Sequence, residues 1–148
     1  AVTLGGSAGS DAFDGAVLGF RAGVALYPGE ARGWGFGVLT DFITAPKSVT
    51  SLRGGLGLEL SMPLASWDES DFRIRPYVIR RVGLDPDIES SPHVGVGIAL
   101  SASLPWTVFD FDYAGLRTEC LFDSDGFDGI LFQFDITALL VLFGLQPN

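Results

Sequence analysis

The most regular feature of the chain is an alternation of apolar residues with polar or small ones. In the stretch 130–143, the even positions from Ile130 to Leu142 are all apolar, whereas Gln133, Asp135 and Thr137 fall among the odd positions. Successive side chains of a β-strand point to opposite faces, so this stretch predicts a strand with one wholly apolar face. A membrane-spanning helix is the alternative for so long an apolar stretch, but the polar residues inside it and the period of two favour the strand.

Clusters of Gly, Pro, Asp and Ser divide the chain into strand-like runs. Eight runs are predicted, at residues 2–10, 15–27, 33–44, 50–64, 72–82, 93–104, 107–122 and 129–143. None of the connections is long enough for a crossover helix, so consecutive strands should pair antiparallel in an up-and-down order. The length of 148 residues predicts a single domain, 1–148.

The two faces of these runs differ in size and polarity. In the second run Leu18 and Phe20 alternate with Gly19 and Arg21, and other runs repeat this contrast between a bulky apolar face and a face of glycine, serine, alanine and charge. A soluble, lipocalin-like barrel would place the bulky face inside and would need abundant charge outside. A membrane barrel would turn the bulky face to lipid, and only a closed barrel pairs every strand backbone group there.

Composition favours the membrane barrel. Charged residues make up only 18% of the chain and hydrophobic residues 47%, and the mean hydropathy is +0.36. Glycine is abundant, with 20 residues, and Lys47 is the single lysine. Glycines weaken a solvated strand, but inside a narrow barrel they leave room for arginines. The formal net charge of −9 argues against nucleic-acid binding. The single cysteine, Cys120, excludes an internal disulfide.

The small face carries arginines and carboxylates that nearly cancel, and we expect them to form a charge network in the lumen. Its expected members are Arg21, Asp41, Arg53, Glu59, Arg73, Arg75, Arg81, Asp110, Asp112 and Asp135. A bulge near Gly115 would add Arg117 and Glu119 to the same face. Because burying an unpaired ion is costly, these charges should pair with one another. The side chains within eight strands can fill the space, so we expect a plugged barrel.

Aromatic residues gather at both expected ends of the barrel, as they do at the two interfaces of membrane barrels. The aromatic belt of one end is expected to contain Tyr27, Trp34, Trp67 and Trp106. The other end is marked by Phe13, Phe42, Phe122 and Phe127.

With these strands, faces and aromatic ends, the chain resembles the small eight-stranded outer-membrane barrels of Gram-negative bacteria, which include the membrane domain of OmpA-like proteins and the OmpX-like proteins. The resemblance is one of pattern and covers the whole chain. It implies an all-β, antiparallel, up-and-down transmembrane β-barrel in the bacterial outer membrane. Both termini would face the periplasm, together with the tryptophan-bearing connections, and the acidic connections would lie outermost.

Some barrels of this size are lipid A deacylases or palmitoyltransferases, which the resemblance would link to a histidine, a serine and a carboxylate near the outer rim. The one histidine is His93, and its candidate partners in a nucleophilic triad are Ser91 or Ser90 as nucleophile and Asp87 or Glu89 as orienting carboxylate. The deacylase pattern has a serine two residues after the histidine, where this chain has Gly95. We therefore expect a loop histidine without a catalytic role.

The connection 123–128 alternates aspartates around a glycine and resembles part of a calcium loop. Its candidate ligands are Asp123, Asp125 and Asp128, but the distal glutamate of such a loop is missing. Aspartate and glycine are also favoured in ordinary tight turns. We therefore expect an acidic turn without a metal ion.

The favoured function is that of a non-enzymatic outer-membrane barrel with a plugged lumen, acting as a structural or anchoring component of the envelope or of a larger envelope complex. A lipid-modifying enzyme that uses His93 and a narrow channel are the alternatives, and a soluble lipocalin-like binding barrel is the alternative fold. No cofactor is expected. The expected partners are outer-membrane lipid, lipopolysaccharide and other envelope proteins.

Overall fold

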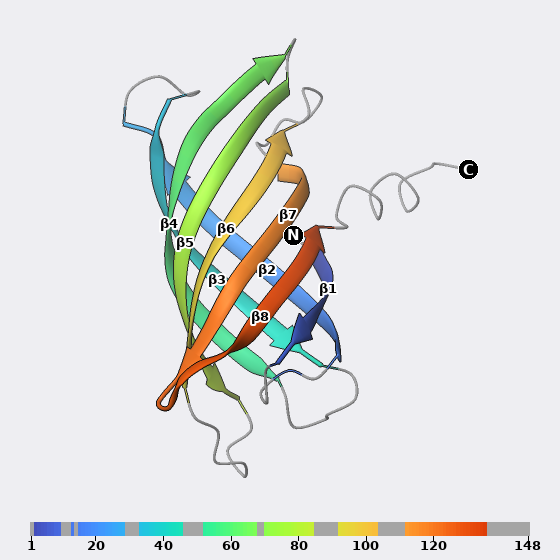
Figure 1. Cartoon of the computed structure of the whole chain (residues 1–148). Coiled ribbons are helices and arrows are strands. Elements are labelled where there is room, and N and C mark those ends of the chain that lie inside the picture. Colours follow the sequence, from blue (N-terminus) through green and yellow to red (C-terminus); the bar gives the residue numbers. More distant parts are fainter. Residues whose placement is uncertain are drawn as a thin grey trace, which may run out of the picture.

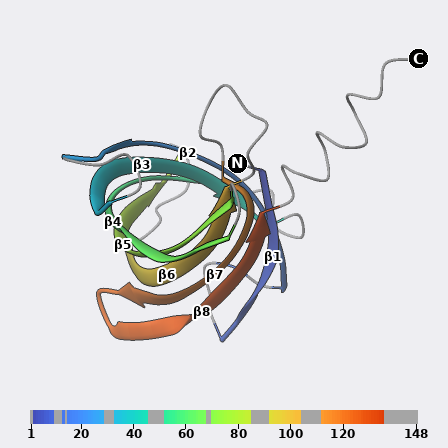
Figure 2. The ribbon, with the colours of Figure 1, turned by 90° about the horizontal axis from the view of Figure 1, so that it is seen from above.

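The chain folds into a closed, eight-stranded β-barrel (Figures 1 and 2). The computed structural model describes residues 2–9, 13, 15–28, 33–45, 52–67, 70–84, 92–103 and 112–135. The strands are β1 (Val2–Ala8), β2 (Gly15–Leu26), β3 (Gly35–Thr44), β4 (Arg53–Trp67), β5 (Ser70–Gly83), β6 (His93–Ser103), β7 (Asp112–Asp123) and β8 (Gly126–Asp135). Each strand pairs antiparallel with the next, and β1 pairs with β8 to close the ring. The predicted all-β, up-and-down barrel is confirmed.

Several strand boundaries differ from the predicted ones. β4 and β5 extend further toward each other than predicted, because their pairing continues to Trp67 and Ser70 past a register shift between Pro63 and Ala65. β8 begins at Gly126, whose φ of 122° suits a glycine in the β7–β8 turn. The predicted strand segments 107–111 and 136–143 lie outside the described residues. Nowhere in the described part of the chain is there a helix long and apolar enough to cross a membrane.

The bulky apolar face of the strands points outward. Large apolar side chains are exposed on every strand, and Val24 and Leu58 are 72% and 62% exposed. The inward neighbours are buried, and Asp41 and Arg81 are only 2% and 0% exposed. This orientation is the one that the sequence favours, and it is the reverse of the one that a lipocalin-like barrel needs.

The interior also contains apolar layers. We name the two ends of the barrel after their connections: the β7–β8 end, at the bottom of Figure 1, and the opposite β2–β3 end. One buried apolar cluster at the β7–β8 end consists of Phe13, Val17, Ile43, Leu121 and Leu131. A second cluster consists of Leu39, Tyr77, Ile79 and Ala99. The consecutive inward positions of β3 are Ile43, Asp41 and Leu39, so a charged layer lies between the two apolar ones.

Phe13 lies at the predicted end of the barrel, but its side chain is inside the barrel and not on the outer surface with the other aromatic residues of that end. It is only 1% exposed and packs inside the β7–β8 end. The hydroxyl of Ser7 donates a hydrogen bond to its backbone carbonyl, which ties this residue to β1. The other phenylalanines of this end, Phe42, Phe122 and Phe127, are 45%, 37% and 63% exposed.

Candidate functional site: a charge network in the barrel interior

Arg81 is fully buried between two carboxylates at the centre of the charged layer. Its Nε and Nη2 donate hydrogen bonds to the two carboxylate oxygens of Asp41, at 3.0 and 2.7 Å. Its Nη2 also donates to Glu119 Oε2 at 2.9 Å, and its Nη1 donates to Glu119 Oε1. Bidentate pairs of this kind combine strong charge-assisted hydrogen bonds with a fixed geometry. The three side chains therefore form a bridge across the lumen from β3 through β5 to β7.

Arg21 and Tyr77 complete this arrangement. Arg21 Nη2 donates to Asp41 Oδ2 at 3.0 Å and lies 3.9 Å from Glu119 Oε2. The Arg21 guanidinium carbon lies 4.4 Å from the centre of the Tyr77 ring, and the Tyr77 hydroxyl donates to Glu119 Oε2 at 2.9 Å. We call Arg21, Asp41, Tyr77, Arg81 and Glu119 the central cluster. Its two cations and two anions balance, and this mutual pairing offsets part of the cost of desolvating them.

Glycines on the intervening strands make room for the central cluster. A Cβ at Gly95 of β6 would lie 1.7 Å from Glu119 Oε1. A Cβ at Gly55 of β4 would lie 2.7 Å from Asp41 Oδ1 and 2.8 Å from Arg81 Cγ. Any larger residue at these two positions would displace the charged side chains, which explains why Gly55 and Gly95 are glycines.

A register shift in the β6–β7 pairing brings Arg117 and Glu119 to the inward face. Ala102 pairs with Ala114, whereas the adjacent Ser103 pairs with Asp112, so one residue of β7 is passed over. This irregularity lies just before Gly115, where the sequence predicts a bulge.

Two further ion pairs lie toward the β2–β3 end. Arg75 Nη1 is 3.7 Å from Glu59 Oε1, and Arg117 Nη2 is 4.0 Å from Asp135 Oδ2. These side chains are 2–16% exposed. The paired charges therefore extend along the lumen beyond the central cluster.

Arg73 is held close to the β2–β3 end. Its Nε donates to Ser61 Oγ at 2.8 Å, and its Nη2 donates to the carbonyl of Gly33. The guanidinium carbon of Arg73 lies over the Tyr27 ring, 4.8 Å from the ring centre. Tyr27 is thus half-buried beside a lumenal arginine, whereas Trp34, a predicted member of the same belt, is 62% exposed.

The expectation of a loop histidine is wrong for His93, which is the first residue of β6 and is only 4% exposed. It lies at the β7–β8 end, and both of its ring nitrogens have partners. Arg53 Nη1 lies 2.8 Å from Nδ1, and Asp128 Oδ2 lies 3.3 Å from Nε2. A guanidinium can only donate, so Nδ1 accepts, and Nε2 carries the ring proton and donates to Asp128. A general base needs its lone pair directed at the nucleophile. The lone pair of His93 is directed at Arg53, so this geometry does not support a triad.

His93 also belongs to the group that comes nearest to a metal site in the described part of the chain. His93, Asp123 and Asp128 each place one ligand atom within 4.8 Å of the others. A metal-bound histidine gives its lone pair to the metal and donates its other N–H. Because Nδ1 of His93 accepts from the cationic Arg53, the group fits an ion-pair cluster better than a metal centre.

The three candidate calcium ligands have different surroundings. Asp123 Oδ1 accepts hydrogen bonds from the backbone N–H groups of Asp125 and Gly126, at 2.8 and 3.1 Å, and so stabilises the β7–β8 turn. Asp128 contacts His93, and Asp125 is exposed. These contacts fit the expected acidic turn.

Several predicted site residues fall outside the part of the chain that the structure describes. Asp87, Glu89, Ser90, Ser91, Trp106 and Asp110 lie outside the described residues, as do the side chains of Trp67 and Asp112. Conversely, the sequence predicts the charged face for Tyr77 but not its place in the charge network, and it does not predict the lumenal position of Asp128. Tyr77 follows Arg73 and Arg75 at the same period of two, and this spacing places it on the charged face.

No protein-family model, curated protein or solved structure matches this chain. The resemblance to small outer-membrane barrels therefore depends on the pattern of strands and faces alone.

Proposed function

We propose that this chain is an integral outer-membrane β-barrel with a closed lumen, acting as a structural or anchoring component of the envelope without enzymatic activity. The observation that carries the proposal is the apolar outer wall, to which all eight strands contribute exposed Leu, Val, Ile or Phe side chains. A soluble monomer rarely exposes so continuous an apolar surface. In a bilayer the same wall contacts lipid, and the closed ring of strands pairs its own backbone groups.

The filled interior supports a barrel that does not conduct ions. The central cluster bridges the lumen from Asp41 through Arg81 to Glu119. Buried apolar side chains lie on both sides of this bridge, and Phe13 packs among those of the β7–β8 end. An ion would have to separate strongly bonded pairs in order to pass, which opposes the channel alternative.

The surroundings of His93 support a non-enzymatic role. Its Nδ1 accepts from Arg53 of β4 and its Nε2 lies 3.3 Å from Asp128 of β8, so the buried ring links these two side chains inside the barrel. A lipid-modifying enzyme would need this ring to face a nucleophile and its substrate.

Cys120 offers a direct test of the membrane orientation. It is the only cysteine of the chain, and it lies exposed on the outward face of β7, paired with Val96 and Ile130. After refolding into phosphatidylcholine vesicles, Cys120 should resist a membrane-impermeant maleimide and should become reactive after denaturation. The control variant combines Cys120→Ser with Asp125→Cys, so that its single thiol lies in the exposed β7–β8 turn. In a vesicle population of mixed orientation this thiol should react with the maleimide.

Two outcomes would refute the proposal. A native protein that is soluble and monodisperse without detergent, with Cys120 freely labelled, would show that the wall faces water. Discrete single-channel currents of the purified protein in planar bilayers would show that the lumen conducts.

A further inference from the structure

Arg80 places a positive charge on the apolar outer wall. Its neighbours in the outward row of β5, Val78 and Val82, are 43% and 46% exposed, and its register partners on β4 and β6 are Leu56 and Val94. Where side chains of the strands are described, it is the only charged residue on the outward face.

The apolar wall continues on both sides of Arg80. Val82 and Leu84, which is 43% exposed, lie between it and the β7–β8 end. Arg80 is three residues from Gly83, the last residue of β5, a separation of about 10 Å along the strand. With the strand tilt of membrane barrels, this places Arg80 about 8 Å inside the strand end. An outward arginine is tolerated near the interface and is increasingly unfavourable with depth, so an anionic partner would stabilise it here.

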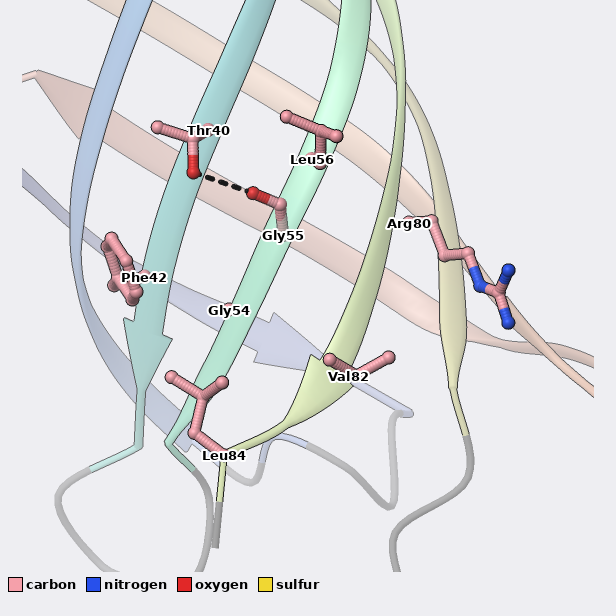
Figure 3. A pocket seen from close by; sticks show the side chains of 8 residues that line it. All are labelled: Thr40, Phe42, Gly54, Gly55, Leu56, Arg80, Val82 and Leu84. Carbon is pink, nitrogen blue, oxygen red and sulfur yellow. Dashed lines mark hydrogen bonds between the residues drawn. The ribbon is translucent and has the colours of Figure 1, made fainter.

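A hollow of about 450 Å³ lies in the wall beside Arg80, over β3, β4 and β5. Figure 3 shows Val82 and Leu84 at its lower part and Phe42 at its left side, with Arg80 extending to the right of the other labelled residues. Gly54, which also lines the hollow, has no side chain, and the Leu84 side chain packs against it, so that a Cβ at Gly54 would lie 3.1 Å from Leu84 Cδ2. The hydroxyl of Thr40 donates to the carbonyl of Gly55 at 2.8 Å, so this hydroxyl is satisfied without water.

We propose that Arg80 and this hollow bind one membrane lipid whose phosphate carries a net negative charge. The phosphate pairs with the guanidinium, and an acyl chain lies along Phe42, Val82 and Leu84. Arginine suits this role because its planar group can bind phosphate oxygens in a bidentate manner. The inference depends on the proposed membrane insertion, and it adds a lipid class and a site to it.

The test uses the full chain refolded into phosphatidylcholine vesicles that contain a small fraction of phosphatidic acid as the probe. Lipid that stays bound after transfer to detergent is measured by native mass spectrometry. The wild type should retain one phosphatidic acid, and Arg80→Gln should lower this retention about tenfold, as expected for the loss of a charge-assisted hydrogen bond. Arg80→Lys should retain part of the preference, and Gly54→Val, which fills the hollow but keeps the charge, should weaken it.

A transplanted arginine distinguishes a site from general charge attraction. Cys120 is exposed on the outward face of β7, three residues from the strand end at Asp123, as Arg80 is from Gly83. The double variant Arg80→Gln/Cys120→Arg should therefore fail to restore retention. Full restoration, equal retention by Arg80→Gln and wild type, or displacement of the lipid by inorganic phosphate would each overturn the inference. If the wild type does not insert into phosphatidylcholine vesicles at all, the proposed function fails instead.

Discussion

Replacing Arg81 by methionine should strongly destabilise the barrel. The arginine donates four hydrogen bonds to two carboxylates, and methionine keeps an apolar stem without any donor. Asp41 and Glu119 would then share one nearby cation, Arg21, at 3.0 and 3.9 Å. One negative charge would remain in the interior without compensation.

The expected magnitude follows from the burial of these groups. Removing one partner of a buried ion pair costs about 3–5 kcal/mol of stability, and Arg81 is 0% exposed. The adjacent Arg80 provides a matched control because it is exposed on the opposite face. Arg80→Met should change the free energy of unfolding by less than about 1 kcal/mol in vesicles of uncharged lipid. The double variant Arg81→Met/Glu119→Gln removes one charge of each sign, so it should be more stable than Arg81→Met by about 1–3 kcal/mol.

Unfolding by urea from phosphatidylcholine vesicles, followed by tryptophan fluorescence and by heat-dependent gel mobility, measures these differences. If Arg81→Met unfolds at the same urea concentration as Arg80→Met, the buried pairs do not stabilise the fold as argued. If the double variant is no more stable than Arg81→Met, the loss comes from packing and not from the uncompensated charge. Should Arg81→Met fail to fold, Arg81→Lys keeps the charge without the bidentate geometry and should fall between it and the wild type.

Gly95→Ala should destabilise the barrel by about 1–3 kcal/mol because its Cβ would overlap the Glu119 carboxylate. In the control Gly6→Ala, the new Cβ would lie 3.4 Å from the nearest backbone oxygen, so the free energy of unfolding should stay within about 0.5 kcal/mol of the wild type. Equal losses of stability for Gly95→Ala and Gly6→Ala in urea unfolding would contradict this account. Phe13→Ala should lower the free energy of unfolding by about 3–5 kcal/mol. The variant should still produce no current in planar bilayers, because the charged bridge remains. A new current would show that Phe13 alone closes the lumen. His93→Ala should leave the lipid A of expressing cells unchanged by mass spectrometry, and an altered acylation pattern would favour the enzyme.

The alternation of residues predicted the fold and the orientation of its faces because both depend on local geometry. A strand sends Gly19 and Arg21 to one side and Leu18 and Phe20 to the other, whatever its partners are. Short connections then leave few topologies, and a closed meander satisfies the backbone of every strand. The charged residues of the inward face could therefore be assigned without knowledge of their contacts.

The partners of those charges could not be predicted in the same way. Opposite strands of a barrel meet through their side chains, so the bridge from Asp41 to Glu119 depends on barrel diameter, stagger and side-chain length together. Phe13 lies in a connection, where the period of two gives no direction. Asp128 follows the β7–β8 turn, and the β7–β8 register shifts between Leu121 and Phe122, so its inward position next to His93 depends on the turn geometry.

The paired charges also explain how a barrel with so uniform a wall can keep one register. Sliding β3 along β4 by two residues would keep every bulky side chain outside, so an apolar environment would hardly oppose the slip. The same slip would move Asp41 away from Gly55, the residue that leaves space between it and Arg81. It would separate a bidentate ion pair inside the barrel and press charged groups against occupied positions. The outer wall thus determines which face is outside, and the central cluster determines how the strands align.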